Sequence, residues 1–109
     1  MLCGTEKLRM KQDPRQHIYE RDNFTCRYCG WSGATSFEQW QLGWFAIDHV
    51  SPIKHGGKED DDTNLVVACH RCNSMKGQEP CSSVEAGKII IARKRAEREA
   101  WFKRFVLKA

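Results

Sequence analysis

Two pairs of cysteines with the same spacing constrain the fold of this chain more than any other feature. Cys26 and Cys29 form one CxxC pair, and Cys69 and Cys72 form a second pair further along the chain. A CxxC turn places two thiolates on one side of an ion, and two such turns complete a tetrahedral zinc site. All four positions around the ion are then taken by protein, so the pattern predicts a structural zinc rather than a catalytic one.

The six cysteines also allow other interpretations. In a secreted protein of this size they would suggest three disulfides, and a CxxC pair can be a redox motif. Residues 1–11 are polar and charged and lack the apolar core of a signal peptide, which favours metal over disulfides. Zinc is therefore the preferred interpretation, with a redox pair or a chance spacing as the alternative. Cys3 and Cys81 lie outside the pattern, and we expect them to have no part in the site.

The length of the chain, 109 residues, fits one domain with a modest hydrophobic core. We predict a single domain over residues 1–109, with its core at about 15–77 and a C-terminal extension at about 84–107. A zinc site would supply folding free energy that so small a core lacks. No apolar run approaches the roughly 18 residues that span a bilayer, so we expect a cytoplasmic location and no membrane partner.

Charge is distributed unevenly along the chain. The formal net charge is +4, and four thiolates around one zinc would lower it to about +2. Such an excess is a weak argument for nucleic acid by itself. However, residues 88–108 contain eight Lys and Arg against two Glu, whereas acidic residues gather at 59–62, where a solvated loop is expected. Binding to a polyanion would therefore depend on local basic patches.

Apolar periodicity and chain breakers predict a mixed α+β chain. Helices are predicted over 15–21, 69–76 and 84–107. Short strands are predicted over 24–29, 44–47 and 65–68, the second ending at Asp48-His49-Val50. Asp13 before Pro14 is typical of a helix start, and Gly77 of a helix end. Loop signals fill 51–63, whereas 31–43 has no clear pattern.

The residues between and after the cysteine pairs follow a recognisable order. Asp48-His49 is followed by Gly56-Gly57 and Asn64, and Asn73 comes directly after Cys72, the last cysteine of the two pairs. In this order and spacing, the sequence resembles the HNH endonuclease family, in its subgroup with four zinc-binding cysteines around a ββα-metal (His-Me finger) core. The resemblance covers about residues 15–77. It implies an α+β fold whose small core is stapled by the zinc site and flanked by an N-terminal helix and a basic C-terminal helix.

The resemblance also implies an activity, that of a metal-dependent DNA endonuclease that hydrolyses phosphodiester bonds. His49 would be the general base, a role that suits imidazole near neutral pH. Asp48 would bind the catalytic cation, and Asn64 would hold the loop and orient the His49 ring. Asn73 would offer its amide oxygen as a second metal ligand. Many members of the family have His at this last position, and an amide oxygen is the harder ligand, so we expect Mg²⁺ or Mn²⁺ rather than Ni²⁺ or Zn²⁺.

Basic residues close to these positions are expected to contact the phosphates of DNA, and they are Lys54, Lys58, Arg71 and Lys76. Phosphate contacts contain no base information, so we expect weak sequence preference and strong salt dependence.

Two other functions remain open at this point. A non-catalytic zinc module that binds DNA or protein would not need Asp48, His49 and Asn73 together, and a scaffold could use the Trp-rich segment 31–44 as an interface. His49 could also be a buried histidine bonded to a backbone carbonyl, and Asn64 a simple turn cap. The joint presence of the three polar residues favours the enzyme.

Overall fold

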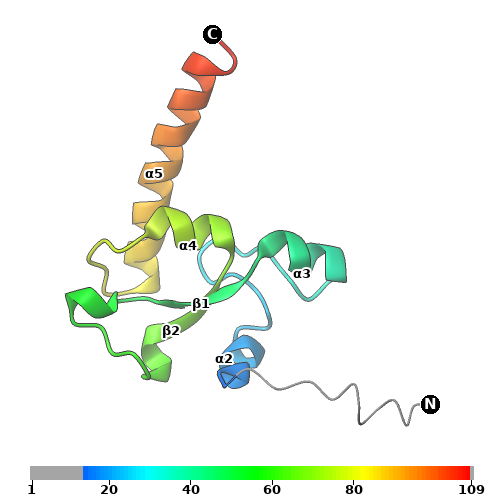
Figure 1. Cartoon of the computed structure of the whole chain (residues 1–109), viewed down its shortest axis with the longest axis vertical. Coiled ribbons are helices and arrows are strands. Elements are labelled where there is room, and N and C mark those ends of the chain that lie inside the picture. The colour runs from blue at the N-terminus through cyan, green and yellow to red at the C-terminus, as the bar shows by residue number, and fades with distance from the viewer. Residues whose placement is uncertain (1–13, 109) are drawn as a thin grey trace.

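The computed structural model describes residues 14–108, and Figure 1 shows a small two-stranded sheet surrounded by helices. Asp13, the predicted helix cap, and Cys3 lie outside the described residues. In chain order the elements are α2 (Gln16–Arg21), α3 (Phe37–Gly43), β1 (Ala46–His49), the 3-10 turns η1 (Ile53–His55) and η2 (Asp62–Asn64), β2 (Leu65–Ala68), α4 (His70–Lys76) and α5 (Val84–Phe105).

The two strands form an antiparallel pair in which Ala46 lies opposite Ala68 and His49 opposite Leu65. Every residue of β2 is buried, so both faces of this strand are covered. Successive side chains of a strand point to opposite faces. Leu65 and Val67 accordingly pack with Ile18 of α2, whereas Val66 and Ala68 pack with the cysteines. β2 thus separates two small apolar clusters.

The helix α4 follows β2 directly and lies beside the sheet, as Figure 1 shows. Gly77 ends this helix, as predicted from the sequence. The strand–strand–helix order of β1, β2 and α4 confirms the α+β fold class with a ββα core.

The segment 24–29 was predicted as a strand, and this prediction is wrong. Asn23 and Phe24 both have positive φ angles, 54° and 52°, so the chain turns sharply where the strand was expected to begin. A single bridge between Thr25 and Ser32 is the only β pairing that the structure gives this segment. The apolar residues that suggested a strand instead belong to a compact turn around the first cysteine pair.

The segment without a clear pattern contains α3, which Ser36 caps by accepting a hydrogen bond from the Gln39 amide at 3.1 Å. Trp44 ends this helix in the left-handed conformation, with φ of 44°. The strand that follows therefore begins at Ala46 rather than at Trp44. The sequence correctly predicted a strand here, but the predicted start at Trp44 is two residues before the observed start at Ala46.

The acidic residues 59–62 lie in an exposed loop, as expected, and two of them also pair with residues near the N-terminal helix. Arg15 donates to the Asp60 carboxylate at 3.1 Å, and His17 lies 3.0 Å from that of Asp62. These contacts attach the loop between β1 and β2 to the N-terminal helix. The sequence did not indicate them, because the partners are far apart along the chain.

The last helix, α5, extends away from the core in Figure 1. Ser83 caps its first turn by accepting from the Ala86 amide at 3.0 Å. Its buried residues, Gly87 and Ile90, both lie in the first half, and α4 packs against this helix. The outer half exposes Trp101 and other large apolar side chains. Among residues 14–108, no helix has the length and apolar character that crossing a membrane requires.

Candidate metal centre and active site

The four predicted zinc ligands come together in one cluster. The sulfur atoms of Cys26, Cys29, Cys69 and Cys72 all lie within 4.8 Å of one another. Four sulfurs at about 2.3 Å from one zinc would be about 3.8 Å apart, so the cluster has the size of a tetrahedral site. The turn after α2 provides the first pair, and the start of α4 provides the second. The geometry and the donor set fit a structural zinc.

The electrostatics of the cluster also fit a cation. Hydrogen bonds with the thiols of Cys26 and Cys72 lower the pKa of Cys69, whereas hydrogen bonds with Cys26 and Cys69 raise the pKa of Cys72. Burial raises the pKa of Cys29. Without a cation, therefore, the cluster stabilises a negative charge on Cys69 and disfavours a negative charge on Cys29 and Cys72. A divalent cation would stabilise all four thiolates together.

A second site lies at the end of β1, where Asp48, His49 and Asn73 line the same pocket. Its volume is about 250 Å³. The strand supplies the first two residues and α4 supplies the third. The sequence placed these residues in one site only through the family resemblance, and in the folded chain they share one pocket.

The His49 ring is held by the loop between the strands. Its Nε2 atom lies 2.9 Å from the Glu59 carbonyl oxygen. A carbonyl can only accept a hydrogen bond, so Nε2 is the donor and bears the proton. In the neutral ring the other nitrogen, Nδ1, then has the free lone pair. His49 does bond to a backbone carbonyl, but it is half-buried and lines the pocket rather than the core.

Asn64 fastens the same loop. Its amide nitrogen donates to the carbonyls of Ser51 and Lys58 at 3.0 and 2.9 Å, and its oxygen accepts from the Ser51 amide at 2.8 Å. The carbonyl that holds the His49 ring belongs to Glu59, the residue after Lys58. Asn64 therefore contacts the loop, and its connection to the His49 ring runs through the backbone.

Asp48 has two side-chain partners that sequence reasoning missed or misassigned. The Tyr28 hydroxyl donates to Asp48 Oδ2 at 2.6 Å, and Lys76 Nζ lies 3.2 Å from the same oxygen. Burial, together with this hydrogen bond, raises the pKa of Tyr28, so the phenol remains protonated. Tyr28 had no separate signal in the sequence, because its spacing to Asp48 does not indicate contact.

The prediction that Lys76 contacts DNA phosphate does not agree with the structure. The Lys76 side chain is completely buried, and its amine pairs with Asp48 and donates to the His49 carbonyl at 3.0 Å. A buried amine that has two oxygen partners in the core is not on a surface that meets DNA. The charge alone suggested a surface role, since lysines are rarely buried unless paired.

The other three basic residues that were predicted to contact DNA, Lys54, Lys58 and Arg71, are exposed. Lys54 lies in η1 and Lys58 in the loop that holds His49. Arg71 stacks on Trp31, with its guanidinium carbon 4.7 Å from the ring centroid. All three side chains lie on the surface, where the phosphates of DNA can reach them.

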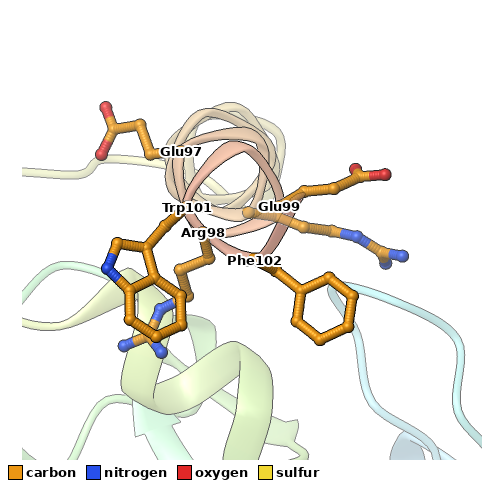
Figure 2. Close-up of a pocket in the computed structure, with 6 residues that line it drawn as sticks. Glu97, Arg98, Glu99, Trp101 and Phe102 are labelled. Carbon is orange, nitrogen blue, oxygen red and sulfur yellow. The ribbon is translucent and has the colours of Figure 1, made fainter. Parts of the chain in front are cut away.

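A larger hollow, of about 850 Å³, lies along the outer half of α5. All of its lining residues, among them Trp101 and Phe102, come from this one helix, and Figure 2 shows their side chains spread around the helix axis. One helix cannot enclose a site, and the lining contains neither the Asp-His pair nor cysteine. The candidate active site is therefore the smaller pocket lined by Asp48 and His49.

The fold and the cysteine cluster define a ββα domain with a site that fits a structural zinc. Residues 26–79 match the sequence pattern of the HNH endonuclease family. The chain therefore belongs to this family, as the sequence predicted. It is also similar to the CRISPR-associated endonuclease Cas9 of Corynebacterium diphtheriae, with 33% identity over 81 residues. That alignment covers 69% of this chain and 7% of the relative, so the chain spans only a small part of the relative's length. No solved structure matches the chain.

Proposed function

We propose that this chain is a metal-dependent DNA endonuclease that hydrolyses phosphodiester bonds, with His49 as the general base. The observation on which this depends is the meeting of Asp48, His49 and Asn73 in one pocket, with Nε2 of His49 bonded to a carbonyl. Membership of the HNH endonuclease family and the similarity to a CRISPR-associated endonuclease both support phosphodiester cleavage.

His49 takes the proton of the attacking water at Nδ1. The bond from Nε2 to the Glu59 carbonyl fixes the ring, so the lone pair of Nδ1 has a constant direction. When the ring accepts a proton, the positive charge is stabilised by the same carbonyl. Asn64 keeps this carbonyl in place by holding the neighbouring residue, Lys58. The base is thus positioned by the loop rather than by another side chain.

In this proposal, Asp48 and Asn73 would hold the catalytic cation. A carboxylate and an amide oxygen are the hard donors that Mg²⁺ and Mn²⁺ prefer, and two protein ligands leave positions for water and phosphate. When bound, such an ion stabilises the negative charge of the phosphate and the departing oxygen. Lys54, Lys58 and Arg71 are exposed and would contact DNA phosphates around the scissile bond.

The test is nicking of supercoiled plasmid by the zinc-loaded protein with Mg²⁺, Mn²⁺ or Ni²⁺, beside His49→Ala and an EDTA control. His55→Ala is the matched control, since His55 is exposed and lies outside the pocket. We expect nicking that requires Mg²⁺ or Mn²⁺, persists in His55→Ala and falls by at least about 100-fold in His49→Ala.

Equal nicking by His49→Ala and the unmodified chain would show that His49 is not the base. Fastest nicking with Ni²⁺ would contradict the oxygen donor set that includes Asn73. DNA binding without nicking, in protein that retains zinc, would favour a non-catalytic zinc module.

A further inference from the structure

The Asp48 carboxylate is held by only one of its two oxygens. The Tyr28 hydroxyl, at 2.6 Å, and the Lys76 amine, at 3.2 Å, both meet Oδ2. Within residues 14–108, the structure gives Oδ1 no hydrogen-bond donor. Asp48 is almost completely buried and yet lines the pocket. A carboxylate whose second oxygen is fixed has little freedom to rotate, so Oδ1 faces a constant direction.

We propose that Tyr28 and Lys76 are positioning residues that fix Asp48 through Oδ2 and so reserve Oδ1 for the catalytic cation. Neither residue lines the pocket, so neither is placed to contact the substrate. Each acts through Asp48. This inference rests on the proposed function, since it takes Asp48 to be a ligand of the cation.

Lys76 connects the two functional residues of β1. Its amine donates to the His49 carbonyl at 3.0 Å as well as pairing with the Asp48 side chain. The side chain is fully buried, so water does not compete for these bonds. One ammonium group from α4 therefore fixes the direction of the metal ligand and the backbone of the general base.

Tyr28 connects Asp48 to the zinc site. It lies between Cys26 and Cys29 in the first CxxC turn, and its ring is buried in the cluster that contains the cysteines. A zinc that fixes this turn therefore also fixes the direction of the Tyr28 hydroxyl. Tyr28 thus connects the turn that holds the structural metal to the Asp48 carboxylate.

The Tyr28 ring also packs against α5. A Cβ atom at Gly87 would lie 2.6 Å from Cε1 of the ring, so the helix approaches this closely only because the residue is glycine. Gly87 lies outside residues 26–79, the part that matches the family. The first half of α5 thus supports the active site from beyond the family region, by holding the ring whose hydroxyl meets Asp48.

Mn²⁺ binding to the zinc-loaded protein without DNA tests the proposal directly, by calorimetry. In Tyr28→Phe we expect Mn²⁺ affinity to fall by about 10-fold or more, the usual size of an effect on a partner of a metal ligand. The Mn²⁺ concentration that half-saturates nicking should rise by a similar factor, while the rate at saturating Mn²⁺ largely recovers. Tyr19→Phe, which removes the other tyrosine hydroxyl of the chain, should bind Mn²⁺ as the unmodified protein does.

Unchanged Mn²⁺ affinity in folded, zinc-loaded Tyr28→Phe would overturn the proposal. If that variant does not retain zinc, Gly87→Ala replaces it, because an added methyl displaces the Tyr28 ring and so moves its hydroxyl away from Asp48 without removing it. We expect the same loss of Mn²⁺ affinity there, and affinity equal to that of the unmodified chain would again overturn the proposal. Asp48→Asn distinguishes a failure of this proposal from a failure of the proposed function. If this variant binds Mn²⁺ as the unmodified chain does, Asp48 is not a ligand of the cation, and the metal assignment in the proposed function fails as well.

Discussion

At the scale of single residues, buried carboxylates organise both sides of the sheet. Asp48 serves the pocket, and Asp22, whose side chain is 2% exposed, serves the fold. Asp22 accepts hydrogen bonds from the side chains of Arg21 and Arg27, each at 2.9 Å, and from the Val67 amide at 2.9 Å. It therefore connects the end of α2, the first CxxC turn and β2. A buried carboxylate with several donors contributes to stability only while it is ionised.

The pKa of Asp22 has a definite consequence for stability. Burial alone would raise this pKa, but the bonds from Arg21, Val67 and Arg27 outweigh burial and hold it below its usual range. The stabilisation is therefore fully present above the unfolded pKa of about 3.9 and is lost as the pH falls through the folded pKa.

We expect Asp22→Asn to lower the free energy of unfolding by about 2–3 kcal/mol at pH 7. This difference from the unmodified chain should shrink as the pH falls below about 4, where the unmodified carboxylate becomes protonated. Denaturant unfolding of both zinc-loaded proteins at pH 7 measures the difference, and zinc content is followed as the pH is lowered, because protonation of the thiolates releases the metal. A difference of less than about 0.5 kcal/mol at pH 7 would show that ionisation of Asp22 is unimportant.

At the scale of secondary-structure elements, α5 supports the ββα core although it begins outside that core. The first half of α5 packs on α4 and on the Tyr28 ring, and its first turn depends on the Ser83 cap. The outer half has no buried residue. Stability gained from α5 should therefore depend on its first turns.

Ser83→Ala removes the cap of α5, and we expect a loss of about 1 kcal/mol in the free energy of unfolding. Ser82→Ala is the matched control, because Ser82 is exposed and its side chain has no hydrogen bond to any residue between 14 and 108. Thermal unfolding of the three proteins, with zinc content measured in parallel, compares them. Equal stability of both variants would mean that the start of α5 adds little to the fold.

At the scale of the whole molecule, two small apolar clusters and one cysteine cluster hold the described residues together. β2 lies between the two apolar clusters, and the cysteines belong to one of them. A core of this size gives limited hydrophobic stabilisation, so the metal has a large share in folding.

Removal of zinc should therefore unfold the protein. We expect Cys26→Ser to lose zinc and its cooperative thermal transition, and a strong chelator to do the same to the unmodified chain. Cys81→Ser is the control, because Cys81 is also buried but lies outside the cluster. Zinc content and circular dichroism during heating measure both effects. A cooperative transition at the original temperature in zinc-free protein would contradict this view.

Much of this molecule follows from local pattern in the sequence. The cysteine spacing predicted the metal cluster, an apolar run predicted β2, the Gly77 cap supported α4, and the many helix formers without Pro predicted the long helix α5. The start of β1 was misplaced, because the left-handed turn at Trp44 depends on how the chain packs rather than on a local signal. The helix α3 was missed, although Ser36 with Gln39 three residues later is a local capping signal. The prediction of a strand over 24–29 was wrong because this segment turns to bring Cys26 and Cys29 to the second cysteine pair, which is distant in the sequence.

Only the tertiary structure decided how the candidate active site is supported. The residues Asp48, His49 and Asn73 were predicted in sequence, but their supports were not: Tyr28 and Lys76 at the carboxylate and Glu59 at the ring. Spacing along a chain predicts which residues a turn or helix brings together, whereas these contacts join segments that meet only after folding. The charge of Lys76 did not predict its role, because the role of a lysine depends on its burial. At a surface its amine would bind phosphate, but in the core it pairs with the Asp48 carboxylate.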